Sequence, residues 1–346
     1  MQARIGWGVI GSGGIARRRT IPEGLMRARN AELRVVYDLD AKANAEVAEQ
    51  LGGRAASDID DLLGSPIEVV YVATPADLHC RQVLHCAAAG KHVLCEKPLG
   101  LTVTETDAMV AACERANVLL GTAFMMRFHA QHQAALAMIR AGKLGTLAYG
   151  RAQLSCWYPP IEGAWRQDLT RGGGGSLTDM GGHCIDLLEM YFGRCVAVSC
   201  FTGNIVHSYK PEDAAVALLH FEGGAVATVD TFFCIPDQSS GNVLEIYGSA
   251  GSIIARNTIG QGERGEMAAY LEHSAGYDAQ QQRAEGGGVH IDPPLVNMYR
   301  AEIEEFSQAI IDGREPANNA QLGLQSQKVL SACYESARTG RMIDIA

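Results

Sequence analysis

A glycine-rich run near the middle of the chain holds two residues suited to acid–base chemistry. Asp179 and His183 stand four positions apart, shortly after four consecutive glycines at 172–175. If the segment is helical, both side chains project from one face and lie within reach of one another. A carboxylate that orients and charges an imidazole is a common way to build a general base. An isolated pair with this spacing is more often a capping aspartate and a core histidine, so other residues must support the catalytic interpretation.

Lys97 is a third candidate for chemistry because of its position. It follows the apolar segment 92–96 and precedes Pro98. Lysines are mostly surface residues, but catalytic groups of doubly wound sheets lie at the carboxyl ends of the strands. Pro98 also favours an extended backbone at Lys97. We therefore expect the Lys97 ammonium group at the edge of a parallel sheet.

A glycine-rich turn near the start of the chain has the pattern G-x-G-x-x-A, which is typical of dinucleotide binding. Its residues are Gly11, Ser12, Gly13, Gly14, Ile15 and Ala16. Gly11 permits the tight turn, Gly13 lets the backbone approach a pyrophosphate, and Ala16 is small enough for helix to pack on strand. Free N–H groups at the helix start receive the anion. The pattern alone is weak, but a strand candidate precedes it and a helical stretch follows.

Asp38 ends the next strand candidate and points to the choice of cofactor. A carboxylate there accepts hydrogen bonds from the adenosine ribose and repels a 2′-phosphate, so we expect NAD. An Asx turn is the structural alternative. NADP stays possible if one of the arginines at 17–19 reaches the ribose. We interpret these arginines as a solvated helix face, because consecutive residues cannot all point one way.

The elements that must position these residues fall into two groups. Up to residue 124, β-branched runs alternate with helical stretches, which predicts an α/β fold with a doubly wound parallel sheet. The expected strands are 5–10, 32–37, 68–73, 92–96 and 118–124, and the expected helices are 41–51, 78–89 and 102–116. Such sheets bind ligands beyond the carboxyl ends of their strands. We assign residues 1–124 to a dinucleotide-binding domain.

Residues 125–346 are expected to form a second α/β domain for substrate binding and oligomerisation. Alternating segments joined by hairpin-like links predict a large open antiparallel sheet with one wet face. The segments are 148–154, 196–201, 214–221, 225–232 and 243–247, with helices at 129–141, 295–311 and 320–339. Residues 257–294 are polar and glycine-rich, and we expect an excursion over the surface. We expect the glycines at 172–175 to form a mobile hinge over the site.

Taken together, these motifs resemble the Gfo/Idh/MocA family of NAD(P)-dependent oxidoreductases, over about residues 4–344. The resemblance rests on 11–16, Thr74-Pro75 with His79, Glu96-Lys97-Pro98, Arg127-Phe128, Trp165-Arg166, and the run 173–186 that ends in His-x-x-Asp. It implies a Rossmann domain followed by a domain with an open antiparallel sheet. It also implies oxidation or reduction of a secondary alcohol or ketone on a sugar, inositol or related polyol.

The resemblance also implies roles for individual residues. Lys97 would touch nicotinamide and substrate, and Asp179 and His183 would complete the catalytic set. Residues on the cofactor side would include Ser12, Gly14, Ile15, Thr74, Pro75, His79, Glu96, Trp165 and Arg166. Arg127 and Tyr158 would contact substrate, and Tyr158-Pro159-Pro160 is similar to sugar reductases of the 1,5-anhydrofructose type. Met125 and Met126 depart from the family, where many members carry a polar asparagine.

In the mechanism that this implies, His183, oriented by Asp179, removes the hydroxyl proton while hydride passes to the nicotinamide. Lys97 donates a hydrogen bond to the developing alkoxide. The sequence leaves open whether Lys97 or His183 accepts the proton. It also leaves two other classes open: a non-redox enzyme that oxidises a sugar only transiently on bound NAD, for elimination or glycosidic cleavage, and a cofactor-binding regulator. The three catalytic candidates together disfavour the regulator.

Charge and composition exclude several other classes of protein. The net charge of −10 disfavours nucleic-acid binding. No apolar run reaches the ~18 residues of a transmembrane span, and the first residues lack a signal peptide's pattern. The ten cysteines contain no C-x-x-C pair, which indicates reduced thiols in the cytoplasm and no zinc site. We interpret His129 and His132 as part of a polar helix face. The open sheet predicts a homodimer or homotetramer.

Overall fold

The computed structural model describes residues 4–271, 279 and 288–345. The first part forms a six-stranded sheet in the order β3-β2-β1-β4-β5-β6, and every neighbouring pair is parallel. The strands are β1 (Ile5–Ile10), β2 (Ala31–Tyr37), β3 (Arg54–Ala55), β4 (Val69–Val72), β5 (His92–Cys95) and β6 (Leu120–Thr122). β1, β4 and most of β5 are buried, as expected for strands covered on both faces. The predicted doubly wound sheet is confirmed.

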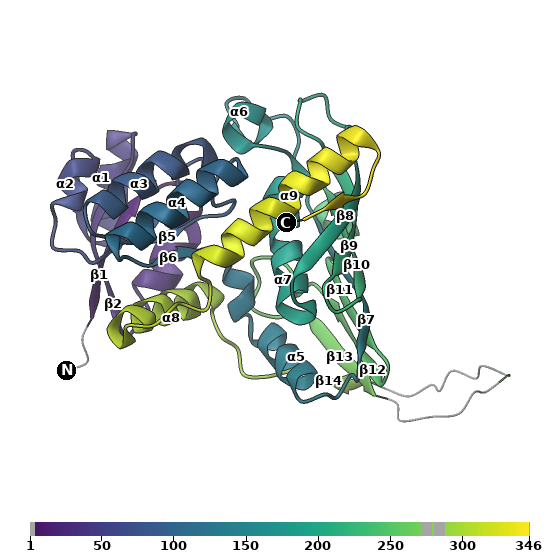
Figure 1. The fold of residues 1–346 in the computed structure, drawn as a ribbon. Coiled ribbons are helices and arrows are strands. Elements are labelled where there is room, and N and C mark those ends of the chain that lie inside the picture. The colour runs from purple at the N-terminus through teal and green to yellow at the C-terminus, as the bar shows by residue number, and fades with distance from the viewer. Residues whose placement is uncertain (1–3, 272–278, 280–287, 346) are drawn as a thin grey trace.

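Helices surround this sheet, and one of them comes from the far end of the chain (Figure 1). The local helices are η1 (Ala16–Leu25, π-helical), α1 (Ala41–Leu51), α2 (Ile59–Leu63), α3 (His79–Ala88) and α4 (Val103–Ala116). Helix α8 (Met298–Asp312) packs against η1. Its Phe306 meets Trp7 edge to face, and Ser307 accepts a hydrogen bond from the Trp7 indole at 3.0 Å. A helix from the range 125–346 therefore helps to build the core of the first domain.

The second part is a nine-stranded sheet in the order β14-β13-β12-β11-β7-β10-β9-β8-β15. Its strands are β7 (Leu147–Ser155), β8 (Cys195–Gly203), β9 (Ala214–Phe221), β10 (Val226–Phe232), β11 (Val243–Gly248), β12 (Gly251–Arg256), β13 (Glu266–Leu271), β14 (Val289–His290) and β15 (Ile343–Asp344). The pairs are antiparallel except that β10 runs parallel to β7. The sheet is thus the expected open one, with a single parallel pairing inside it.

One face of the nine-stranded sheet is covered by helices, and the other is open (Figure 1). The helices of this part are α5 (Ala130–Arg140), α6 (Leu169–Gly172), α7 (Gly182–Phe192) and α9 (Ala320–Thr339), with short turns η3 (Met125–Phe128), η4 (Trp165–Gln167), η5 (Leu177–Gly181, π-helical) and η6 (Asp237–Ser239). Along β9, Ala217 and Leu219 are buried while Val216 and Leu218 are exposed. Helix α9 contacts α4 on one side and α7 and β8 on the other. It therefore links the two domains.

Two expectations for the second part are wrong. Residues 257–294 are more than a surface excursion, because β13 and β14 extend the sheet and Ile259 and Met267 are buried in its core. Most of the polar stretch in this range, 272–278 and 280–287, lies outside the described residues. His129 and His132 do not form a polar helix face, because both are buried with ring centroids 4.7 Å apart. Burial lowers the pKa of His132 to about 3.

The described residues show neither a metal-binding cluster nor a membrane-spanning helix. Among the described residues, no group of three or more His, Cys, Asp or Glu side chains is placed to hold a metal ion. Within the same ranges, none of the helices is long and apolar enough to cross a membrane. All ten cysteines are free thiols, and seven of them are buried.

Candidate active site

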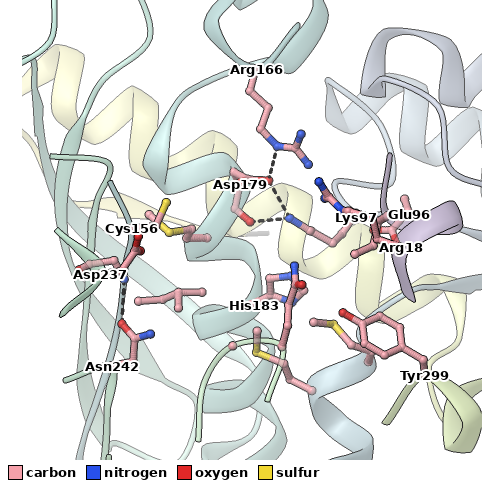
Figure 2. A pocket seen from close by; sticks show the side chains of 18 residues that line it. Arg18, Glu96, Lys97, Cys156, Arg166, Asp179, His183, Asp237, Asn242 and Tyr299 are labelled. Carbon is pink, nitrogen blue, oxygen red and sulfur yellow. Dashed lines mark hydrogen bonds and ion pairs between the residues drawn. The ribbon is translucent and has the colours of Figure 1, made fainter. Parts of the chain in front are cut away.

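A cavity of about 380 Å³ lies where the carboxyl end of the parallel sheet faces the second domain. Lys97, Asp179 and His183 all line it, as do Ile15, Glu96 and Arg166. Figure 2 shows Lys97, Arg166, Asp179 and His183 converging from different elements. Lys97 follows β5, Arg166 is in η4, Asp179 is in η5 and His183 is in α7. The fold thus brings together the three residues that the sequence suggested for catalysis.

Asp179 is bound by two cations in this cavity. The Lys97 ammonium group donates to Asp179 Oδ1 at 2.9 Å and to its backbone oxygen at 2.6 Å, and Arg166 Nε donates to the same Oδ1 at 2.9 Å (Figure 2). Burial alone would raise the pKa of Asp179, but Arg166 and Lys97 outweigh it and hold that pKa well below its usual range. Asp179 is therefore a carboxylate that fixes the position of Lys97.

The expected orientation of His183 by Asp179 is wrong. Among the hydrogen bonds of the described residues none joins the two side chains, and His183 Nδ1 is buried without a partner. Burial and the charge of Lys97 lower the pKa of His183 well below its ordinary value. A neutral imidazole competes poorly for a carboxylate that two cations bind, because charge-assisted hydrogen bonds are roughly twice as strong as neutral ones. His183 is therefore a neutral imidazole that faces the cavity.

Glu96 supports the strand end that carries Lys97. Its carboxylate accepts hydrogen bonds from the Tyr71 hydroxyl and from the Lys97 backbone N–H. Tyr71 in turn pairs with Thr20 of η1 at 3.1 Å. Burial raises the pKa of Glu96, and the charge of Lys97 opposes this. These contacts connect the Lys97 backbone to the first helix.

The glycine turn has the geometry that the dinucleotide pattern requires. Gly11 has a φ of +83°, and a Cβ there would lie 2.8 Å from the backbone of Ala73. The Gly13 N–H donates to Asp38 Oδ2 at 3.1 Å, and a Cβ on Gly14 would meet nothing within 4 Å. Ser12 is buried, with Oγ 3.4 Å from Asn44. The turn is thus held by contacts with Ala73, Asp38 and Asn44, and the space beside Gly14 is open.

The three arginines of η1 point in three directions, as expected for consecutive helical residues. Arg17 contacts Glu46 and Gln50 of α1. Arg18 lines the cavity, and Arg19 pairs with Glu23 at 3.0 Å. Arg18 is exposed, as expected for a solvated helix face, and it also lines the cavity, which was not expected.

Other residues predicted to bind the cofactor lie outside the lining of the cavity and contact residues next to it. The His79 ring is buried between the backbone oxygens of Pro98 and Thr74, each at 2.9 Å. Thr74 donates its hydroxyl to Gln82 at 2.6 Å, and Pro75 precedes the short turn η2 (Ala76–Leu78). The Trp165 ring stacks on the Arg166 guanidinium at 4.2 Å. His79 and Trp165 thus hold, respectively, the Thr74 turn and Arg166.

The two predicted substrate residues Arg127 and Tyr158 do not line the cavity. Arg127 Nε donates to both carboxylate oxygens of Asp186, at 2.7 and 2.9 Å, and its guanidinium is turned away from His183's cavity. Tyr158 packs on Phe233 at 4.9 Å. Arg127 is thereby held in an ion pair with a buried carboxylate, and its contact with substrate stays a prediction.

The sequence argument missed several lining residues. They are Leu154, Ser155, Cys156, Met180, Asp237, Asn242, Gly260, Gln261 and Tyr299. Asp237 and Asn242 come from the segment between β10 and β11, while Tyr299 comes from α8 near the end of the chain (Figure 2). Only the sheet register brings Ser155 and Asn242 together, through a hydrogen bond of 3.1 Å from the Ser155 N–H. No local pattern marks such residues.

Comparison with known proteins gives the family. Residues 5–124 match the model for an oxidoreductase family with an NAD-binding Rossmann fold, and residues 132–254 match that for a GFO/IDH/MocA C-terminal domain. The chain is 30% identical to the 1,5-anhydro-D-fructose reductase of Ensifer adhaerens over 98% of each chain. The chain belongs to the Gfo/Idh/MocA family. The predicted resemblance is confirmed, and so is an NAD(P)-dependent oxidoreductase with a Rossmann domain.

Two further proteins are similar to most or all of the chain. An aldose-aldose oxidoreductase from Caulobacter crescentus, solved with glycerol, superimposes with a TM-score of 0.88, 26% identity, and coverage of 99% of this chain and 100% of that one. The myo-inositol 2-dehydrogenase of Thermotoga maritima is 30% identical over 76% of this chain and 81% of its own. These relatives carry names of enzymes that act on sugars and inositol.

Proposed function

We propose that this enzyme transfers hydride between a nicotinamide and a secondary alcohol or ketone of a sugar, inositol or related polyol. The observation that carries the proposal is the single cavity in which Lys97, Asp179 and His183 meet beside the glycine turn. The 30% identity to a 1,5-anhydro-D-fructose reductase favours a sugar ketone or ring alcohol as the reacting group. Ser155, Asp237 and Asn242 add polar groups opposite the catalytic residues, which suits a hydroxylated substrate.

The residues present fit a dinucleotide. The open side of Gly13 and Gly14 would hold the pyrophosphate, and Asp38 would accept the ribose hydroxyls. Arg18 and Tyr299 line the path from this turn to Lys97. Tyr299 is buried, and the Arg19 guanidinium lies 5.2 Å from its ring.

The protein groups divide the proton chemistry between them. A nicotinamide held beside Lys97 would supply the hydride chemistry. His183 is neutral, so its ring accepts the hydroxyl proton during oxidation and returns it during reduction. Lys97, held by Asp179, donates a hydrogen bond to the substrate oxygen where negative charge develops. We therefore assign His183 as the base, Lys97 as the electrostatic catalyst and Asp179 as the residue that positions Lys97.

The first test is turnover of the purified chain with NAD(H) and NADP(H) on a panel of sugars and polyols. The panel includes 1,5-anhydro-D-fructose, levoglucosan, D-xylose and myo-inositol. We expect one equivalent of cofactor oxidised or reduced per product. Product without net cofactor turnover would instead indicate transient oxidation by a non-redox enzyme, and cofactor binding without any product would indicate a regulator.

The second test addresses the residues. We expect His183→Ala and Lys97→Ala to lose about 10²–10⁴-fold in kcat, the usual contribution of a positioned acid–base group. Both variants should bind NADH with wild-type affinity in a fluorescence titration. His220→Ala, on the exposed side of β9, is the matched control and should keep full activity. Loss of NADH binding in Lys97→Ala would show that Lys97 serves the cofactor instead.

The open face of the nine-stranded sheet supports a homodimer or homotetramer. Phe201, Val216, Leu218 and Val226 are exposed on neighbouring strands of that face. An apolar face of this kind is typically covered by another subunit. We expect light scattering at micromolar concentration to give at least twice the mass of one chain, and a monomeric mass would contradict this. The ten free thiols favour a reducing compartment such as the cytoplasm.

A further inference from the structure

Two buried hydroxyl groups next to the catalytic cavity form a hydrogen-bonded chain that ends at Glu96. The Tyr71 hydroxyl donates to Glu96 Oε1 and lies 3.1 Å from Thr20 Oγ1. A tyrosine hydroxyl has one proton, and Glu96 accepts it, so Thr20 donates to the Tyr71 oxygen. Tyr71 is on β4 and Thr20 is on η1, and each is 1% exposed. The chain is therefore directed at Glu96 and shielded from water.

Glu96 connects this chain to Lys97. Its other oxygen, Oε2, accepts from the Lys97 backbone N–H at 3.2 Å. Glu96 and Lys97 both line the cavity, and Figure 2 shows them together on one side of it. If Glu96 takes up a proton, one of its oxygens becomes a donor and a poorer acceptor, so one of the two contacts weakens. Ionised Glu96 is therefore the form that holds both Tyr71 and the Lys97 backbone.

Several groups around Glu96 decide its charge. Burial raises the pKa of Glu96, while the Lys97 charge, the Tyr71 hydroxyl, the Lys97 N–H and the Arg166 charge lower it. Arg18 of η1 lines the same cavity and adds a third cation. Tyr71 differs from these cations in that its hydroxyl can be removed while every charged side chain stays in place.

The buried carboxyl group of Glu302, on α8, is the contrasting case. Glu302 is 2% exposed, and among the described residues only Asn318 donates to its side chain, at 3.1 Å. Burial and the charge of Glu96 raise the pKa of Glu302 well above its ordinary value, and they also raise that of Tyr299 on the same helix. When two carboxyl groups share a buried region, the one with more donors and nearer cations keeps its charge. Here that group is Glu96.

We propose that Tyr71 is a positioning residue, whose hydroxyl keeps Glu96 ionised so that Glu96 holds the strand end from which Lys97 reaches the substrate. The inference rests on the proposed hydride transfer, in which Lys97 donates to the substrate oxygen. Asp179 fixes the ammonium group of Lys97, whereas Glu96 fixes its backbone. Hydrogen bonds to charged groups are stronger than those to neutral groups, so loss of the Tyr71 hydroxyl favours protonated Glu96.

Tyr71→Phe tests this proposal, because it keeps the ring and removes only the hydroxyl. The Tyr71 hydrogen bond lowers the pKa of Glu96, so its loss raises that pKa, and Glu96 takes up a proton at higher pH. We expect the acid limb of kcat to move up by about one pH unit, with the KM for NADH unchanged. Tyr191→Phe is the matched control, because its buried hydroxyl donates to the His132 backbone oxygen, away from this chain. An acid limb that stays in place in Tyr71→Phe, or moves equally in Tyr191→Phe, would overturn the proposal.

A double-mutant cycle determines whether Tyr71 acts through Glu96. Glu96→Gln cannot ionise, so adding Tyr71→Phe to it should change kcat by less than about twofold. An equal loss of kcat in both backgrounds would mean that Tyr71 acts by packing alone, and the proposal would be wrong. Thermal unfolding of each variant checks that the fold is kept.

The charge of Glu96 can also be measured without turnover. In protein labelled with ¹³C at the glutamate carboxyl groups and saturated with NADH, the Glu96 signal is identified by its loss in Glu96→Gln. We expect this signal to titrate about one pH unit higher in Tyr71→Phe. Equal titration in both proteins would overturn the role of Tyr71. A chain that turns over no sugar or polyol would instead contradict the proposed function, and the titration would still decide whether Tyr71 keeps Glu96 ionised.

Discussion

Two glycine-rich segments of this protein each lead into a π-helical turn, and they use glycine for opposite reasons. The turn at 11–14 precedes η1 and is open, since a Cβ on Gly14 would meet nothing within 4 Å. The run at 172–175 precedes η5 and is packed, since a Cβ on Gly175 would overlap the backbone oxygen of Glu212 and one on Gly174 would overlap the Tyr334 hydroxyl.

The two segments also differ in what satisfies their backbone N–H groups. In the second run, the Glu212 carboxylate accepts from the N–H groups of Gly175 and Leu177, at 2.9 and 3.0 Å, and Tyr334 donates to the same carboxylate. The expected mobile hinge is therefore wrong, because a buried carboxylate of the protein occupies the anion position. In the first turn the Asp38 carboxylate accepts from the Gly13 N–H at 3.1 Å, and the open side of Gly14 is left to a ligand. Glycine content alone does not distinguish a binding turn from a packed one.

The largest effect that this comparison predicts is on folding. Gly175→Ala forces a methyl group into the backbone of Glu212, and such overpacking costs ~3 kcal/mol. We expect a large drop in the thermal unfolding midpoint or loss of soluble protein. Gly182→Ala is the matched control at the start of α7, because its Cβ would lie 3.9 Å from Leu330, an ordinary contact. It should unfold at or above the wild-type temperature. A stable Gly175→Ala would show that the run yields easily.

The next effect is on the cofactor and leaves the fold intact. Gly13→Ala places a methyl group 3.5 Å from Asp38 Oδ2, which the free protein tolerates. The same methyl group lies where the backbone must approach a pyrophosphate. We expect an unchanged unfolding temperature but an NADH affinity lowered about tenfold, or ~1.4 kcal/mol. Fluorescence titration measures this, and wild-type affinity would mean that the pyrophosphate lies elsewhere.

The sequence predicted the elements whose signals are local. The parallel sheet, the glycine turn and Lys97 at a strand end follow from short apolar runs and their spacing, and the fold places them as expected. Contacts between distant segments were not predictable in this way. One of the two partners of Asp179 is Lys97, 82 positions away, and the partner of Arg127 is Asp186, 59 positions away. Both ion pairs depend on which charged side chains the fold brings together, and the sequence alone does not show this.

The smallest effect concerns the choice between NAD and NADP at Asp38. Its carboxylate lies beside the glycine turn, where a 2′-phosphate would have to go, and the following Leu39 is 78% exposed without a charge to offer. Arg17 is turned to α1 and Arg18 to the cavity, so neither is directed at Asp38. We expect a preference for NAD in kcat/KM. Asp38→Ser keeps a small acceptor for the Gly13 N–H but removes the repulsion.

The matched control for Asp38→Ser is Asp40→Ser, two residues further on. Asp40 caps α1 by accepting from the N–H groups of Lys42 and Ala43, and serine caps a helix as well. We expect Asp38→Ser to lose about tenfold in kcat/KM with NAD and to gain with NADP, which corresponds to ~1.4 kcal/mol each way. Asp40→Ser should change neither value. A wild-type enzyme that prefers NADP would contradict this prediction. It would mean that an arginine of η1 turns to the ribose when the cofactor binds, so that a residue of the helix, and not Asp38 after β2, selects between NAD and NADP.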